Sequence, residues 1–478
     1  MFKYQTFILI ILLINFNACI NRYVVPTPQV NHLFDKSYTH KSLELHKKNN
    51  RNYIPSSDSH NNVLYFLDMG MLNFYSGDGI TSNQLLSQAG MAIEKNFTKS
   101  ISQYASSFIM DDRILNYNGE AYEDIYLNVF KALNYFQLNN VDAAGVELRR
   151  VNEKMRNLQD KYAKMAQKIS QDAQIRSARL KIKTERINFY NSALSRYLSS
   201  IYYQFEQQYD DARIDIQHAY AAFSQQKMIY NFEKPRHLSI MYQCLSRHGD
   251  ACFKTKKESV YLVAFAGRAP EKKAKTYWII SKKNYIIIAK TKNGSGRIEA
   301  IPFPGAKAGL FFQFSFPYMQ KRQNNVKKIV AFIGQKSVQM EKLEDMANVA
   351  IETFNLKQKL IYLKTIVRAT AKGLIAANIK KKMGKNKKKL KKQKKINFLG
   401  NLLIDAAISA TEKADLRLSS FFPAAAYSGI LSVRPGTYRV KIIYYNSRNK
   451  PIKVQNLGKQ RITKNGLNLI QSSYYGIY

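Results

Sequence analysis

The sequence predicts an α+β protein with a helical amino-terminal part and a β-rich carboxy-terminal part. Helical periodicity with recurring small residues begins at Val63. After Cys252 the chain changes to short aromatic and β-branched segments separated by Gly, Pro and Asn. With 478 residues, 45% of them hydrophobic, the chain can bury a sizeable core. We therefore expect a helical repeat domain at 63–232, a junction at 233–257, and a β-sandwich-like domain formed by 258–338 and 413–478 around a helical insertion at 339–412.

Residues 1–18 have the form of a signal peptide. The apolar run from Phe7 to Ile14 is shorter than the roughly 20 residues that a helix needs to cross a bilayer. The segment ends in Ala18 and Cys19, an arrangement that resembles the lipid-attachment box of bacterial lipoproteins. This resemblance implies that Cys19 carries the acyl chains of a membrane anchor. Ile20, in place of an Asp, favours the outer membrane, with the protein facing the periplasm or the cell surface. The alternative is an ordinary secretory signal with a chance cysteine.

The next segment, 19–62, is expected to be a flexible tether. It contains Pro26, Pro28 and Pro55 among many Asn, Ser and His residues, and it has no sustained periodicity. Such a tether would separate the acyl anchor from the folded body.

Three segments of the helical part align with one another and resemble tetratricopeptide-like helical hairpins. Small residues stand where two helices would cross, at Gly70, Ala132 and Ser200, and each is followed by a turn and a second helix. The alternative is a helical bundle that shares this spacing because small residues pack well at any crossing. A repeat array would expose a concave groove for a peptide or another protein. The positions expected to line the groove are Met71, Phe74, Leu133, Phe136, Ile201 and Gln204, unless the same residues are simply core.

The junction contains Cys244 and Cys252, separated by a short loop with a glycine. An exported chain is in a compartment that permits disulfides, so we expect these two cysteines to be paired. A zinc site that uses His248 would have too few ligands within reach.

Positive charge is concentrated in the carboxy-terminal half. The chain has 75 Lys and Arg against 33 Asp and Glu, a net charge of +42, and residues 251–478 contribute 46 of the basic and 10 of the acidic residues. In the densest part, 11 of the 16 residues from Lys380 to Lys395 are lysine. An exported protein does not normally meet nucleic acid, so the expected partners are anionic lipids or cell-wall polymers. The alternative is a solvated loop. The candidate contacts are Lys380, Lys381, Lys382, Lys387, Lys388, Lys389, Lys391, Lys392, Lys394 and Lys395.

A second resemblance covers nearly the whole mature chain. Asp415-Leu416-Arg417, Phe422-Pro423 and the Pro435-Gly436-Thr437-Tyr438 turn are similar to elements of an uncharacterised family of bacterial lipoproteins with tetratricopeptide-like helices. That family typically has a Trp soon after the Asp-Leu-Arg element, where this chain has Ser419 or Ser420. The family has no established reaction, so the resemblance implies architecture and cellular address.

No arrangement of residues points to catalysis. The chain has no Gly-x-Ser-x-Gly elbow, no His-Glu-x-x-His motif and no phosphate-binding glycine loop, and Asp415 and Arg417 would not face each other on a helix. We expect a non-enzymatic, lipid-anchored envelope protein without cofactor or metal, whose helical repeats bind a protein partner. An outer-membrane or cell-wall maintenance assembly is the candidate setting. The alternative is a wall-active or wall-binding protein that engages peptidoglycan or an anionic envelope polymer with its basic β-domain.

Overall fold

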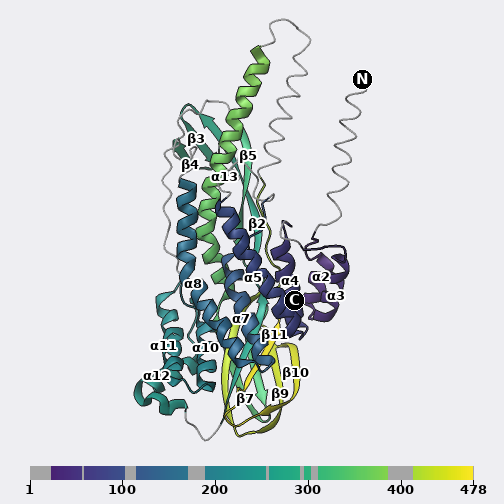
Figure 1. Cartoon of the computed structure of the whole chain (residues 1–478), viewed down its shortest axis with the longest axis vertical. Coiled ribbons are helices and arrows are strands. Elements are labelled where there is room, and N and C mark those ends of the chain that lie inside the picture. Colours follow the sequence, from purple (N-terminus) through teal and green to yellow (C-terminus); the bar gives the residue numbers. More distant parts are fainter. Residues whose placement is uncertain are drawn as a thin grey trace.

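A computed structural model describes residues 23–55, 59–102, 115–170, 189–253, 258–290, 295–302, 311–385 and 413–476. Helices occupy most of the chain before residue 253 and strands most of the chain after it, which confirms the α+β class (Figure 1). Within the described ranges, no helix is both long and apolar enough to span a bilayer. The helices are α2 (Pro28–Asp35), α3 (Thr39–Asn49), α4 (Asn62–Tyr75), α5 (Gly79–Ser102), α7 (Ala121–Gln137), α8 (Val141–Ser170), α10 (Ala193–Phe205), α11 (Tyr209–Gln225), α12 (Arg236–His248), the short 3₁₀ helix η1 (Gly249–Phe253) and α13 (Met346–Lys385).

Three helical hairpins form the amino-terminal body, and they pair α4 with α5, α7 with α8, and α10 with α11. The turns share one feature, because the second residue after each first helix has a positive φ: 82° at Gly77, 56° at Asn139 and 60° at Gln207. The first crossing requires a glycine, since a Cβ at Gly70 would lie 2.8 Å from Cδ2 of Leu86.

The predicted tether is wrong for residues 23–55. Helices α2 and α3 pack against the body, and the Phe34 ring is fully buried, 4.8 Å from the Phe421 and Tyr475 rings. Pro28 begins α2 instead of preventing it, because Thr27 caps the helix and a proline at the first helical position loses no hydrogen bond. The prolines therefore mark a helix start within a folded unit.

Strands from both sides of α13 complete one seven-stranded sheet, with the order β10-β9-β6-β7-β8-β1-β11. Strand β1 is parallel to β11 and antiparallel to β8, so the segment that follows the insertion pairs with the segment that precedes it. The helical insertion begins at Met346 and not at 339, because Met340 and Leu343 are buried residues of a strand. The strands are β1 (Glu258–Arg268), β6 (Lys328–Ile333), β7 (Lys336–Glu344), β8 (Pro423–Val433), β9 (Gly436–Tyr445), β10 (Pro451–Ile462) and β11 (Leu469–Tyr474).

Strand β1 of this sheet is buried on both faces. Along β1, Tyr261 and Phe265 join the core shared with the helices, where Phe265 packs on Phe130 of α7. The alternate residues Leu262 and Ala264 face a second core formed by the strands themselves. Burial on both faces explains why β1 reads as a nearly continuous apolar run.

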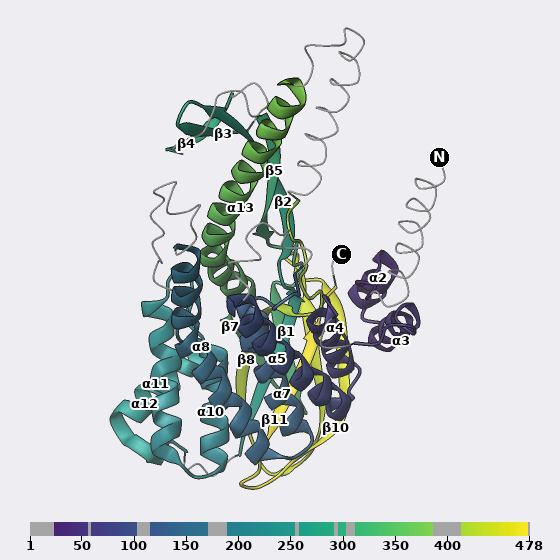
Figure 2. The ribbon, with the colours of Figure 1, turned by 45° about the horizontal axis from the view of Figure 1, so that its top comes forward.

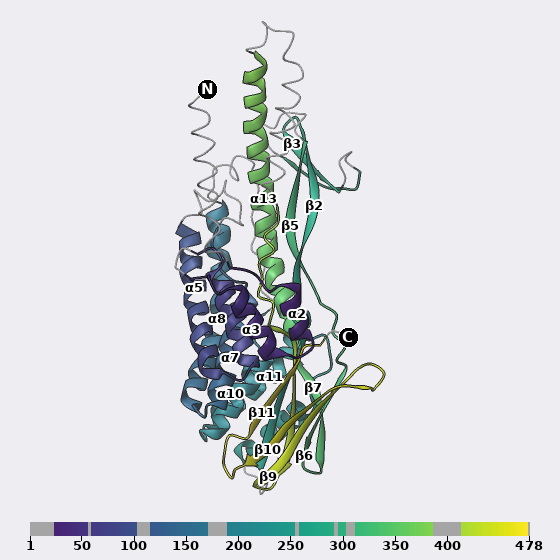
Figure 3. The same ribbon diagram turned by 90° about the vertical axis from the view of Figure 1, so that its right-hand side faces the viewer.

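The remaining strands form an arm together with α13. Strands β2 (Glu271–Lys282), β3 (Tyr285–Ala289), β4 (Arg297–Pro302) and β5 (Phe311–Gln320) make a four-stranded sheet with the order β4-β3-β2-β5. Helix α13 packs along this sheet through Tyr362, whose ring lies 5.3 Å from that of Phe316. We call these four strands and α13 the arm, because they project together beyond the helical hairpins (Figures 2 and 3).

Candidate functional site

The groove predicted on the helical hairpins is not open. Met71, Phe74, Leu133, Phe136 and Ile201 are all buried in the core. The Phe74 ring packs 5.0 Å from Phe130, which in turn contacts Phe265 of the sheet. Gln204, the sixth predicted residue, accepts a hydrogen bond from the Tyr261 hydroxyl. The prediction of an open groove is therefore wrong, because the chain's own sheet covers this face of the hairpins.

The other predicted sites are the cysteine pair, the lysine run and the lipid-attachment cysteine. The sulfur atoms of Cys244 and Cys252 are 2.01 Å apart, the distance of a disulfide, at the end of α12 and in η1. Lys380, Lys381 and Lys382 belong to the last turns of α13, at the outer end of the arm. Cys19 and the candidate lysines from Lys387 to Lys395 lie outside the described residues.

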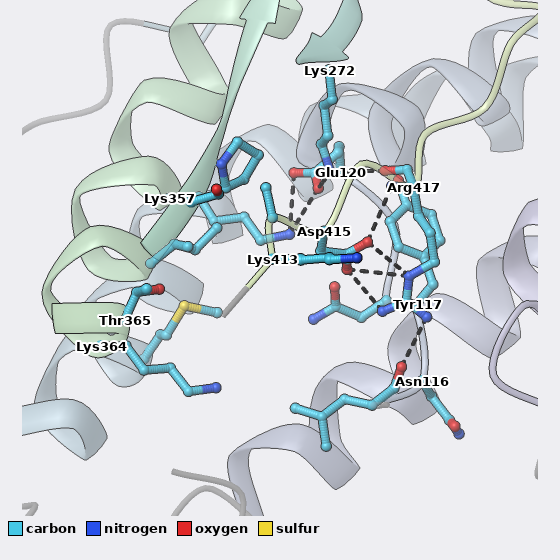
Figure 4. Close-up of a pocket in the computed structure, with 17 residues that line it drawn as sticks. Asn116, Tyr117, Glu120, Lys272, Lys357, Lys364, Thr365, Lys413, Asp415 and Arg417 are labelled. Carbon is cyan, nitrogen blue, oxygen red and sulfur yellow. Dashed lines mark hydrogen bonds and ion pairs between the residues drawn. The ribbon is translucent and has the colours of Figure 1, made fainter. Parts of the chain in front are cut away.

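A cluster of buried charges lies where the arm meets the body, and we call it the seam. Glu120 immediately precedes α7, and its carboxylate contacts Lys272 Nζ of β2 at 2.6 Å and Lys357 Nζ of α13 at 3.0 Å. The side chains of Glu120 and Lys272 are only 2% and 3% exposed. One carboxylate from the body thus joins both elements of the arm (Figure 4).

A second ion pair of the seam comes from the extended segment 413–422. Arg417 donates from Nε to Asp415 Oδ1 at 2.9 Å and from a terminal nitrogen to Oδ2 at 2.8 Å. The argument that side chains at i and i+2 do not face each other holds for a helix, whereas this segment is not a helix and the Arg417 side chain folds back on Asp415. Arg417 also donates to the Leu115 carbonyl at 2.9 Å, and its own carbonyl accepts from Lys272 at 2.8 Å.

Two further carboxylates of the body hold the same segment by its backbone. Ser419 donates its N–H to Glu123 Oε1 at 2.7 Å and its hydroxyl to Asp68 Oδ1 at 2.8 Å. Ser420 donates its N–H to Asp68 at 3.0 Å. Ser419 and Ser420 therefore make polar contacts with side chains of α4 and α7.

The four buried carboxyl groups fall into two electrostatic classes. Burial opposes ionisation of Glu120, but Lys272 and Lys357 outweigh it and hold the pKa of the Glu120 carboxyl below its usual value. Burial likewise opposes ionisation of Asp415, and Arg417 lowers its pKa. For Glu123 and Asp68, burial outweighs the hydrogen bonds that these carboxyl groups accept and raises their pKa values to about 7 and about 6.

A cavity of about 110 Å³ opens at the seam, large enough for several water molecules or one small anionic group. Figure 4 shows lysine side chains from several elements around it. Its walls include five cationic residues and two carboxylates, and the two carboxylates pair with three of the cations, so the wall keeps a surplus of positive charge. The wall charges therefore favour an anion. The cationic residues are Lys272, Lys357, Lys364, Lys413 and Arg417.

The positive charge extends from the seam along the arm. Residues 271–320 carry nine Lys or Arg and two Asp or Glu, and residues 346–385 carry nine and one. Lys273 and Lys275 follow buried Lys272 on β2 and are exposed, as are Lys282 and Lys283 where that strand ends. Of these, Lys273 contacts Glu271 at 2.9 Å. The arm thus presents cations to solvent with few carboxylates nearby to balance them.

Among the described residues, no group of three or more His, Cys, Asp and Glu side chains could hold a metal ion. Comparison of the chain with protein-family models, with curated proteins and with solved structures finds no match. The local geometry is therefore the basis for assigning a function.

Sequence reasoning missed most of the seam. It singled out Asp415 and Arg417 but gave no reason to choose Glu120, Lys272 or Lys357. Glu120 is separated from Lys272 by 152 residues and from Lys357 by 237, and no local pattern joins them. The one available signal was the capping arrangement at the start of α7, in which Glu123 Oε2 accepts from the Glu120 N–H at 2.8 Å.

Proposed function

We propose that this chain is a non-catalytic, lipid-anchored protein of the cell envelope that binds an anionic envelope polymer with its basic arm. The observation that carries this proposal is the charge surplus of the arm, 18 basic against 3 acidic residues in 271–320 and 346–385. Such a surface repels itself unless anions from outside the chain balance it. The seam cavity at the base of the arm offers a site for one anionic group of the polymer.

Export and lipid anchoring rest on the signal-like segment and Cys19, which also support an outer-membrane address. A Cys19→Ser variant should leave the membrane fraction and lose the mass of the acyl chains. A variant that stays in the membrane fraction with unchanged mass and mobility contradicts the anchor. A non-catalytic role is supported by the seam, where each carboxylate is engaged by a cation or by hydrogen-bond donors.

A protein scaffold is the second candidate function. The repeated turns and the close crossing at Gly70 support a relation to tetratricopeptide-like hairpins, and the two cores on either side of the sheet support a sandwich-like domain. Because the sheet covers the inward face of the hairpins, a protein partner would need another surface. The exposed apolar side chains near α11 and α12 favour that location: Ile214, Met228 and Ile240.

Charge-matched variants of the full mature chain with Cys19→Ser test the proposed function. Four arm lysines changed to Gln should weaken retention on purified anionic wall polymer at low salt, whereas four lysines around β10 changed to Gln should not. The difference should vanish near 1 M salt, where the Debye length is about 3 Å. Equal losses, or no loss in either variant, would contradict the proposal. The arm set is Lys273, Lys275, Lys282 and Lys283, and the control set is Lys450, Lys453, Lys459 and Lys464.

A further inference from the structure

The amino-terminal end of the described chain is fixed to the body. The Tyr23 side chain is buried, and its hydroxyl donates to Asp68 Oδ2 at 2.6 Å. The next residue, Val24, accepts from and donates to the Asn50 side-chain amide, at 3.0 and 2.8 Å. Residue 23 therefore has a defined place beside α3 and α4.

This fixed position limits where an anchored membrane can lie. Cys19 precedes Tyr23 by four residues, and an extended chain spans at most about 3.3–3.6 Å per residue, so the two are no more than about 14 Å apart. An acyl anchor at Cys19 therefore brings the side of the body that carries α2 and α3 to the membrane surface.

That side carries exposed apolar and cationic side chains together. Val24, Val25 and Ile54 are 39%, 54% and 71% exposed. Lys48 and Arg51 are exposed at the end of α3. We call these five residues the docking patch.

Two contacts bring the parts of the docking patch together. The hydrogen bonds between Val24 and Asn50 place the first segment against the end of α3. The Tyr23 and Tyr53 rings lie 5.6 Å apart, which places the residues before α2 beside those after α3. Apolar side chains flanked by cations suit the boundary between lipid headgroups and acyl chains.

We propose that the docking patch binds an anionic lipid bilayer and holds α2 and α3 against the membrane. The proposal rests on the lipid anchor of the proposed function, because the anchor selects this face. The apolar side chains enter the headgroup region, and Lys48 and Arg51 face anionic headgroups. Helices α11 and α12 lie on the other side of the body and then face away from the membrane (Figures 1 and 2).

Fluorescence of the full mature chain with Cys19→Ser tests the contact without acyl chains. An environment-sensitive fluorophore is attached at Val25→Cys or, as the matched control, at Val454→Cys, since Val454 is an exposed valine of β10. Vesicles of phosphatidylcholine with phosphatidylglycerol should shift the emission of the fluorophore at position 25 to the blue and leave that at position 454 unchanged. Unchanged emission at position 25 overturns the proposal, even if the protein sediments with the vesicles, because another surface such as the arm then makes the contact.

A charge-matched pair of variants supplies a second readout. Lys48→Gln with Arg51→Gln should weaken partition onto the same vesicles by about 30-fold at low salt. Each of the two basic residues contributes a similar part of the binding free energy near an anionic surface. Lys459→Gln with Arg461→Gln, on β10, should leave partition unchanged. Equal losses in the two variants overturn the proposal. Failure of the anchor is measured separately, by the mass of the native protein, so the two failures are distinguishable.

Discussion

The seam and the arm use the same basic side chains in opposite ways. In the seam, Lys272 and Lys357 are withdrawn from water and share the Glu120 carboxylate. On the arm, Lys275 and Lys282 are exposed on the same strand, in a region with six times as many basic as acidic residues. A buried cation needs a partner from the chain itself, whereas an exposed cation can take its partner from outside. The seam therefore fixes the arm to the body, whereas the arm keeps cations exposed to solvent.

The largest expected effect comes from breaking the charge balance of the seam. Glu120→Gln leaves two ammonium groups without their carboxylate and should lower the free energy of unfolding by about 3–5 kcal/mol. Glu44→Gln removes an exposed carboxylate that contacts Lys47 at 3.2 Å and should cost no more than about 1 kcal/mol. Urea unfolding of both variants measures the difference. Equal costs would show that the seam is not a structural ion cluster.

The inward face of the hairpins should behave as core and not as a binding surface. Met71→Ala removes a fully buried side chain and should destabilise the protein by about 2–5 kcal/mol. Met228 is 65% exposed, so Met228→Ala should change stability by less than about 0.5 kcal/mol. Thermal unfolding compares the two methionines. If the Met71→Ala protein were as stable as the native protein but bound a protein partner less well, Met71 would line an open groove and this prediction would be wrong.

The two carboxyl groups at the start of α7 should respond differently to pH. The pKa of Glu123 is raised to about 7, so the folded state holds its proton more firmly than the unfolded state and loses this stabilisation as the pH rises from about 4.5 to about 7. The destabilisation caused by Glu123→Gln should therefore be larger at pH 5 than at pH 8, by about 2 kcal/mol. The pKa of Glu120 is lowered, so the cost of Glu120→Gln should be nearly constant over this range. Urea unfolding of both variants at several pH values measures these costs. The same dependence on pH for both variants would contradict the opposite pKa shifts of Glu123 and Glu120.

Sequence reasoning predicted what depends on local pattern. The small residues at Gly70, Ala132 and Ser200 marked real hairpins, and the strands on both sides of α13 do share a sheet. The predictions of a tether and of an open groove were wrong for the same reason. An apolar side chain such as Phe34 or Phe74 has the same sequence signature whether it meets a partner or a distant part of its own chain.

The seam could not be predicted because its partners are far apart in the sequence. Lys272 lies between Glu271 and Lys273 and is followed by four exposed residues, and its side chain is buried because it contacts Glu120 at the start of α7. Asp415 and Arg417 were recognised as a pair, but their contact depends on a segment that is extended and not helical. Charge surplus, in contrast, is a property of composition, so the basic half was evident from the sequence.

Hydrogen–deuterium exchange of the full mature chain with Cys19→Ser, with and without purified anionic wall polymer, tests most directly whether the arm is the binding surface. The account predicts slower exchange in peptides from 271–320 and 346–385 when polymer is bound, and unchanged exchange in α4, α5, α7 and α10. Protection confined to the helical hairpins, or bound polymer with no protection in the arm, would contradict it.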